Sequence, residues 1–167
     1  ILEILGPKNT FDYPKPTRLL GRILDIASKK DSIILDSFAG SGTTAHAVLK
    51  QNAEDGGTRQ FILVQIPQPI DAKKQKEAHS FVTQTLGQPE ATIFEITAER
   101  IRRAGAKLEA ERAAKTTAAS AATAQGDLLP VDAPEVPPLD TGFRVFELVD
   151  DPDALILQKP LQYATQA

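Results

Sequence analysis

The amino-acid sequence predicts an α/β fold built on a parallel sheet. Residues 33–35 form a short apolar run that is followed at once by a glycine-containing loop and a helix start. A second apolar run, residues 61–66, comes after a pair of glycines. Continuous apolar runs are typical of parallel strands that are covered on both faces. The two segments therefore predict a strand–helix–strand unit with neighbouring strands.

The loop after the first strand is the most informative part of the chain. Gly40 and Gly42 allow a sharp turn and a close approach of the backbone to a ligand. We expect Thr43 or Thr44 to cap the helix that follows, whose free N–H groups form a site for a carboxylate or a phosphate. Asp36, at the carboxyl end of the strand, is placed to accept a hydrogen bond from a cationic or hydroxyl-bearing ligand.

Glycine spacing alone leaves the ligand open. The pattern Gly40-x-Gly42-x-x-Ala45 matches the relaxed dinucleotide fingerprint, and it also fits a plain tight turn. A nicotinamide-dependent oxidoreductase calls for an acidic residue at the end of the second strand. Gln65 stands there instead, which argues against that class.

The residues around the glycines are more specific. Residues 36–44, Asp-Ser-Phe-Ala-Gly-Ser-Gly-Thr-Thr, resemble the S-adenosylmethionine loop of the amino-methyltransferases that modify exocyclic nitrogens of DNA bases, although Pro is frequent where Ser37 stands. Residues 11–20 resemble the Lys-Pro element just upstream of that loop in the β group of these enzymes. Residues 61–67 and 93–105 are similar to the large methylation (Mod) subunits of type III restriction-modification systems.

The resemblance implies a Rossmann-like S-adenosylmethionine-dependent methyltransferase fold, of which this chain holds the cofactor-binding half of the sheet. It implies that S-adenosylmethionine is the cofactor. Lys15 and Thr17 would border its amino-acid end and Gln65 its ribose; without the resemblance, Lys15 is read as a solvated lysine beside a turn. The complete set of expected cofactor-binding residues is Lys15, Thr17, Asp36, Phe38, Gly40, Ser41, Gly42, Thr43 and Gln65.

Two amphipathic helices flank the strand–helix–strand unit. Pro16 or Thr17 opens the first, and its apolar stripe is Leu19, Leu20, Ile23, Leu24 and Ala27. We expect Thr97 to cap the second, with an apolar stripe at Ile101, Ala104 and Leu108. Three arginines of this second helix could contact DNA phosphate, although the interleaved acidic residues favour a solvated helix face: Arg100, Arg102 and Arg103.

The C-terminal third changes composition. Residues 107–124 can still be helical because they are rich in alanine, whereas the prolines of residues 125–138 predict an exposed connector. Residues 139–149, similar to the same Mod subunits, alternate apolar side chains on both faces and predict a further strand in the sheet. We therefore divide the chain into a methyltransferase half (1–112), an Ala/Pro-rich connector (113–138), and a strand with a C-terminal tail (139–167).

The catalytic element of the amino-methyltransferases is missing. It reads (Asp/Asn/Ser)-Pro-Pro-aromatic in that family, and the one Pro-Pro pair here, Pro137-Pro138, lies between Val136 and Leu139. We therefore expect no catalytic residue in this chain, and we expect a C-terminal fragment of a larger protein that begins upstream of Ile1. The two histidines, at 46 and 79, lack partners at ligand spacing, so we expect structural roles and no metal site.

Composition bounds the remaining possibilities. The 167 residues are 41% apolar and 25% charged with a net charge of −3, which fits a globular class but not a strongly basic DNA-binding domain. Cysteine is absent, which excludes disulfides and thiolate chemistry. No apolar stretch is long enough to cross a membrane, and a cytoplasmic setting is expected.

The resemblance implies the function. The whole enzyme would transfer a methyl group from S-adenosylmethionine to an exocyclic amine of double-stranded DNA, with adenine N6 favoured over cytosine N4. Its expected partners are an N-terminal half with the catalytic and target-recognition elements, a restriction subunit and a second copy of the enzyme. Two alternatives stay open at this point: a non-catalytic cofactor-binding or interaction module, and one half of a nicotinamide-dependent oxidoreductase.

Overall fold

The computed structural model describes residues 2–6, 11, 13–123 and 139–148. Strand β1 (Ile33–Asp36) pairs in parallel with β2 (Gln60–Leu63), with Ile33 opposite Gln60 and Asp36 opposite Leu63. Helix α3 (Thr43–Asp55) connects the two strands. The predicted strand–helix–strand unit is therefore confirmed as an α/β arrangement with a small parallel sheet.

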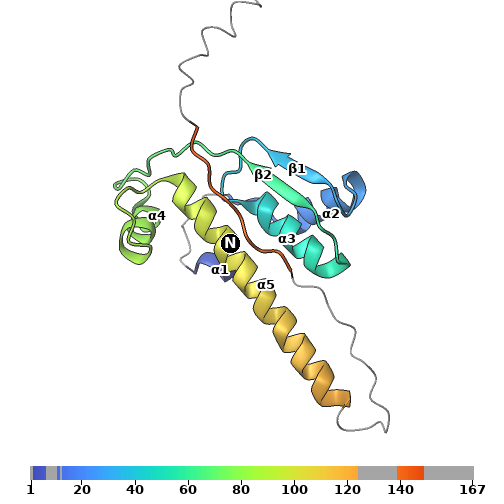
Figure 1. The fold of residues 1–167 in the computed structure, drawn as a ribbon. Coiled ribbons are helices and arrows are strands. Elements are labelled where there is room, and N and C mark those ends of the chain that lie inside the picture. The colour runs from blue at the N-terminus through green and yellow to red at the C-terminus, as the bar shows by residue number, and fades with distance from the viewer. Residues whose placement is uncertain (1, 7–10, 12, 124–138, 149–167) are drawn as a thin grey trace, which may run out of the picture.

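The other helices surround this unit. Helix α2 (Thr17–Ala27) packs against α3, and the long helix α5 (Ile93–Thr123) also packs against α3 before extending away from it (Figure 1). Three shorter pieces complete the order of elements: α1 (Leu2–Leu5), α4 (Lys76–Ser80) and the π-helical turn η1 (Phe81–Thr85). The predicted helix at residue 17 is thus confirmed.

Helix α3 is the centre of the core because it is packed on two sides. Ala45 and Leu49 contact Ile101 and Leu108 of α5 in one apolar cluster. Ala47 and Val48 join Leu24 of α2 in another, and Phe61 of β2 packs against both. A third cluster joins α1, η1 and the start of α5, with the buried members Leu5, Ile70, Ala78, Phe81, Val82, Ala91 and Ile96.

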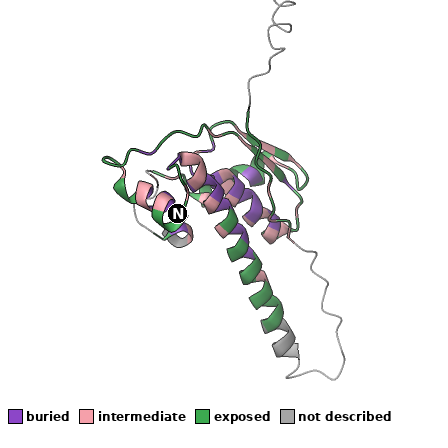
Figure 2. Cartoon of the chain, turned by 60° about the vertical axis from the view of Figure 1, so that its left-hand side comes forward, coloured by how far each residue is buried: buried purple, intermediate pink, exposed green. Residues whose placement is uncertain are grey.

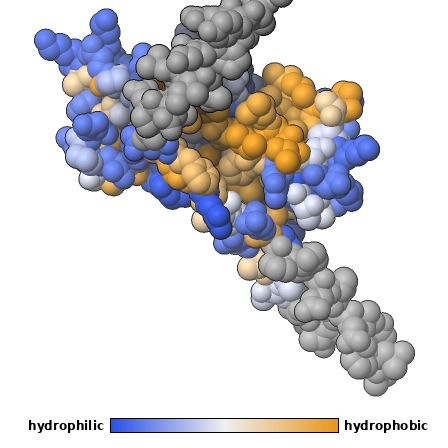
Figure 3. Space-filling model, turned by 45° about the horizontal axis from the view of Figure 1, so that its top comes forward, coloured by the Kyte–Doolittle hydropathy of each residue, from blue (hydrophilic) through white to orange (hydrophobic). Residues whose placement is uncertain are grey.

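One face of the sheet is open. Apolar side chains that alternate along the two strands and their C-terminal extension lie 39–70% exposed: Ile33, Leu35, Ile62, Val64 and Ile66. The two strands alternate between exposed and intermediate residues (Figure 2), and Figure 3 shows a continuous apolar area in this region. Within the described residues, helices pack on one face of the sheet alone, and the expected cover of the second face is not present there.

The segment 139–148 forms no strand in the structure. It runs beside α5, where Leu139 and Phe143 pack on the cluster around Ile101. Thr141 donates a hydrogen bond to Glu109 and lies against Gly105. A Cβ added to Gly105 would lie 2.9 Å from the Cβ of Thr141. The predicted strand is wrong for the described residues, because Leu139 and Phe143 pack on α5 whereas Val145, Phe146 and Leu148 are exposed and pair with no strand.

The boundaries of the predicted domains stay predictions. Helix α5 runs through the proposed division at residue 112, and residues 124–138 of the proposed connector lie outside the described residues. Among the helices that are described, none is long and apolar enough to span a membrane.

Candidate cofactor site

The glycine loop, residues 37–42, lies at the carboxyl end of β1 and is fixed at several points. Ala39 N–H donates to Val64 O at 3.0 Å, which continues the pairing of the two strands into the loop. Gly40 has φ +53° and Gly42 has φ +72°, conformations that favour glycine. A Cβ on Gly42 would lie 3.2 Å from Thr97, so the close approach at this glycine is to α5.

Asp36 organises the exposed side of the loop. Its two carboxylate oxygens accept from the backbone N–H of Phe38 at 3.1 Å and from the hydroxyl of Thr44 at 2.5 Å. Helix α3 therefore starts without a side-chain cap: Gly42 is the N-cap residue, and the prediction that Thr43 or Thr44 caps the helix is wrong. The ring of Phe38 is 86% exposed, so it presents a large apolar surface beside the loop.

Gln65 joins the second strand to the loop. Its side-chain oxygen accepts from Gly40 N–H at 2.7 Å, and its side-chain nitrogen donates to Ile66 O at 2.9 Å. The residue expected at the ribose therefore lies at the glycine loop, as its sequence position predicts. Its role toward a ligand stays a prediction.

Ser41 and Thr43 face the interior. Both residues are buried, and their hydroxyls accept from the guanidinium of Arg100. Thr97 donates to Gly40 O and to Ile93 O and lies inside α5, which begins at Ile93. The prediction that Thr97 caps this helix is therefore wrong. Thr97 and Arg100 of α5 thus fix the glycine loop by hydrogen bonds that local sequence patterns do not reveal.

The Lys-Pro segment reaches the loop through an aromatic ring. Phe11 Cζ lies 3.5 Å from the position of a Cβ on Gly40. Lys15 is exposed and Thr17, the first residue of α2, is half-buried. The roles of Lys15 and Thr17 toward a cofactor stay predictions.

The three arginines considered for DNA binding have different environments. Arg100 is 1% exposed, so neither the possible DNA-phosphate contact nor the favoured solvated helix face holds for this residue. Arg103 donates to Glu99 at 2.6 Å and to Leu5 O at 3.2 Å. Arg102 lies 3.5 Å from Glu99 and stacks over Phe143, yet its side chain is 53% exposed. A phosphate contact by Arg102 or Arg103 stays a prediction.

His46 lies on the second turn of α3. Burial, with a further contribution from the nearby charge of Arg100, lowers its pKa to about 4, so the imidazole is neutral at pH 7. Its Nδ1 is buried and has no hydrogen-bond partner among the described residues. Within that same part of the chain, no cluster of His, Asp and Glu could hold a metal ion.

Another buried polar cluster, missed at the sequence level, fixes the end of α3 to the start of β2. Asn52 exchanges two hydrogen bonds with the backbone of Arg59, at 2.9 and 3.1 Å. The guanidinium of Arg59 pairs with Asp55 at 2.9 Å, which lowers the pKa of that carboxyl. The spacing Asn52-x-x-Asp55-x-x-x-Arg59 is the signal that could have indicated this cluster.

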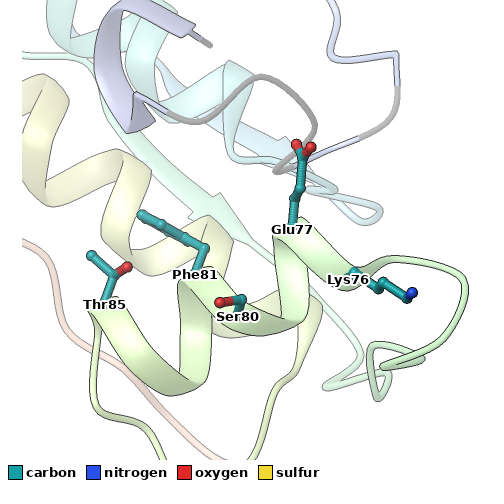
Figure 4. Close-up of a pocket in the computed structure, with 5 residues that line it drawn as sticks. All are labelled: Lys76, Glu77, Ser80, Phe81 and Thr85. Carbon is teal, nitrogen blue, oxygen red and sulfur yellow. The ribbon is translucent and has the colours of Figure 1, made fainter.

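A shallow hollow on α4 and η1 lies apart from the glycine loop. It is lined by Lys76, Glu77, Ser80, Phe81 and Thr85 (Figure 4). Glu77 and Lys76 point in different directions and Phe81 points toward α5, so the polar groups do not converge on one point. The glycine loop is accordingly the better candidate site.

Comparisons with known proteins identify the family of this chain. A profile of the DNA methylase family matches residues 4–104, which contain the Lys-Pro segment and the glycine loop. The chain is 46% identical over 114 residues, 68% of its length, to the type III restriction-modification enzyme StyLTI Mod subunit of Salmonella typhimurium.

Two further relatives match shorter stretches. The EcoPI Mod subunit of Escherichia phage P1 is 46% identical over 99 residues (59% of this chain), and the type II methyltransferase M.KpnI of Klebsiella pneumoniae is 47% identical over 70 residues (42% of this chain). The chain spans 14–16% of the length of these three relatives. From the extent of the profile match, the chain belongs to the DNA methylase family.

Proposed function

We propose that this chain is the cofactor-binding part of an enzyme that methylates an exocyclic amine of DNA, adenine N6, in a type III restriction-modification system. The observation that carries the proposal is the glycine loop at the carboxyl ends of two parallel strands, with Asp36 and the exposed Phe38 on its open side. Membership in the DNA methylase family and the names of the related Mod subunits support it.

The residues of the loop fit S-adenosylmethionine. The carboxylate of Asp36 keeps lone pairs for a ligand hydroxyl or ammonium, and the ring of Phe38 offers a flat apolar surface to an adenine. Gln65 fixes Gly40, so the backbone is held in one conformation before a ligand arrives. When bound, S-adenosylmethionine supplies an electrophilic methyl group on a sulfonium, and the residues of this chain orient it.

The remainder of the longer protein would complete the site. The catalytic Pro-Pro element and the target-recognition region would come from the upstream sequence. Further strands and helices of a Rossmann-like fold would cover the open sheet face, because a two-stranded parallel sheet leaves apolar side chains such as Leu35 and Ile62 in water. A restriction subunit and a second copy are the proposed protein partners, and DNA as substrate implies a cytoplasmic setting.

Calorimetric titration tests the cofactor assignment. We expect the chain to bind S-adenosylhomocysteine and not NAD, and Asp36→Ala to weaken that binding by about tenfold or more, since hydrogen bonds to charged groups contribute roughly 1.5–3 kcal/mol. The matched control is Asp31→Ala, which removes the same charge just before β1, at the other end of the strand. Binding of NAD, or equal effects of the two variants, would contradict the assignment.

A second experiment separates an enzyme from a non-catalytic module. The chain is joined to the upstream coding sequence, and transfer of a labelled methyl group to duplex DNA is measured. The proposed enzyme incorporates label, and Asp36→Ala lowers the incorporation. A full-length protein that binds S-adenosylhomocysteine but never methylates DNA would be a binding module instead.

A further inference from the structure

Arg100 joins the two residues that flank Gly42. Its Nη1 donates to the backbone oxygen of Ser41 at 3.2 Å, to the Ser41 hydroxyl at 2.6 Å and to the Thr43 hydroxyl at 2.7 Å. The two hydroxyls are themselves 3.2 Å apart. One buried guanidinium nitrogen therefore fixes the loop on both sides of the N-cap residue of α3.

Arg100 forms no ion pair with any carboxylate in the described part of the chain. Arg102 and Arg103 on the same helix, by contrast, share Glu99. Burial lowers the pKa of Arg100 to about 10, so it stays charged at pH 7. Its Nε is also buried without a partner in the described chain. An unpaired buried charge is costly, so its position calls for a physical reason.

The guanidinium of Arg100 contacts Ser41 and Thr43, on either side of the N-cap residue of α3. Helix α3 has 13 residues and begins at Gly42 without a side-chain cap, so its first N–H groups carry the positive end of the helix dipole. The charge of Arg100 adds to that positive potential from the interior side. Both sources favour an anionic group on the outer side of the loop.

We propose that Arg100 is a positioning residue of the cofactor site, which sets the conformation of residues 41–43 and favours a ligand carboxylate there through its unpaired charge. The proposal rests on the proposed function, in which the ligand is S-adenosylmethionine and the carboxylate is that of its amino-acid end. It assigns to Arg100 a role in ligand preference that a purely structural residue would not have.

The test compares two ligands that differ in the carboxylate alone: S-adenosylhomocysteine and its decarboxylated analogue, S-adenosyl-3-thiopropylamine. Both are titrated into the full chain and into Arg100→Gln. We expect the variant to lose about tenfold or more in affinity for S-adenosylhomocysteine and about twofold or less for the analogue, because a buried charge acts on the carboxylate through a low dielectric. Arg102→Gln, an exposed arginine of the same helix, is the matched control and should leave both affinities unchanged.

The outcomes are distinguishable. Equal losses for both ligands in a folded Arg100→Gln variant would make the residue a scaffold alone and overturn the proposal, as would unchanged binding. If Arg100→Gln does not fold by circular dichroism, Arg100→Lys decides: it keeps the charge and should keep the preference for the carboxylate within about threefold. A wild-type chain that binds both ligands equally contradicts this inference alone, whereas one that binds neither contradicts the proposed function and the inference together.

Discussion

The neutral His46 makes the stability of the fold depend on pH in a defined window. Its pKa falls from 6.5 to about 4 on folding, chiefly through burial and then through the charges of Arg100, Lys50 and Lys107. Between these two values the unfolded chain binds more protons than the folded one, so stability is complete above pH 6.5 and is lost as the pH falls toward 4. Below about 4 this group contributes no further change.

The magnitude follows from the shift. Each unit corresponds to about 1.4 kcal/mol, which gives roughly 3 kcal/mol for the whole window and about 2 kcal/mol between pH 7 and 4.5. Because His46 is only partly shielded from water, we expect about 1–2 kcal/mol in that interval. The paired carboxyl of Asp55 has its own pKa lowered below 3.8, so its stabilisation is lost in a more acidic range.

Urea unfolding at a series of pH values measures this dependence. The free energy of unfolding of the wild-type chain should fall between pH 7 and 4.5, and His46→Gln should remove most of that slope whatever its effect on absolute stability. His79→Gln, which removes the other histidine and leaves His46 in place, should keep the slope. A slope that survives in His46→Gln, or a wild-type chain without one, would refute the reasoning.

Two further substitutions test the packing. Gly42→Ala should destabilise the fold more than Gly56→Ala, because both residues have positive φ but only at Gly42 would the new Cβ approach Thr97. Thermal melting should show a loss in the free energy of unfolding of about 1 kcal/mol for Gly56→Ala and about 2 kcal/mol or more for Gly42→Ala. Equal losses would contradict this expectation. Asn52→Ala should cost about 2–3 kcal/mol in urea unfolding, since it leaves buried backbone groups of Arg59 unpaired, and a loss below about 0.5 kcal/mol would show that these bonds contribute little.

The elements that local patterns specify were predictable. The apolar run at 33–35, the glycine loop and the second run at 61–66 correctly predict β1, α3 and β2, because each depends on neighbours in sequence. The choice of Asp36 and Gln65 as residues beside the loop also follows from their positions at the ends of parallel strands.

The errors arise where distant segments decide the outcome. Arg100 lies in a charged stretch with Glu99 and Arg102, so its local sequence predicts an exposed side chain. In the structure the side chain is buried and donates to the hydroxyls of Ser41 and Thr43. Thr97 is a typical capping residue, but its hydroxyl bonds Gly40 O across 57 positions of sequence. In the alternating segment 139–148 only Leu139 and Phe143 pack, and they pack on α5 and not beside a strand, a partner that periodicity does not specify.

The hydrogen bonds from α5 to the glycine loop determine which segments must be exchanged together in a chimeric protein. The loop and the start of α3 occupy one short stretch of sequence, but the groups that set its conformation, Thr97 and Arg100, belong to a helix more than fifty positions downstream. A chimera that receives residues 33–49 alone would therefore contain the glycine loop but lack the two residues that fix its conformation, Thr97 and Arg100. A graft of residues 33–49 together with residues 93–101 would carry the loop and the residues that fix it. Substitutions in one of these two segments should therefore depend on the residues of the other.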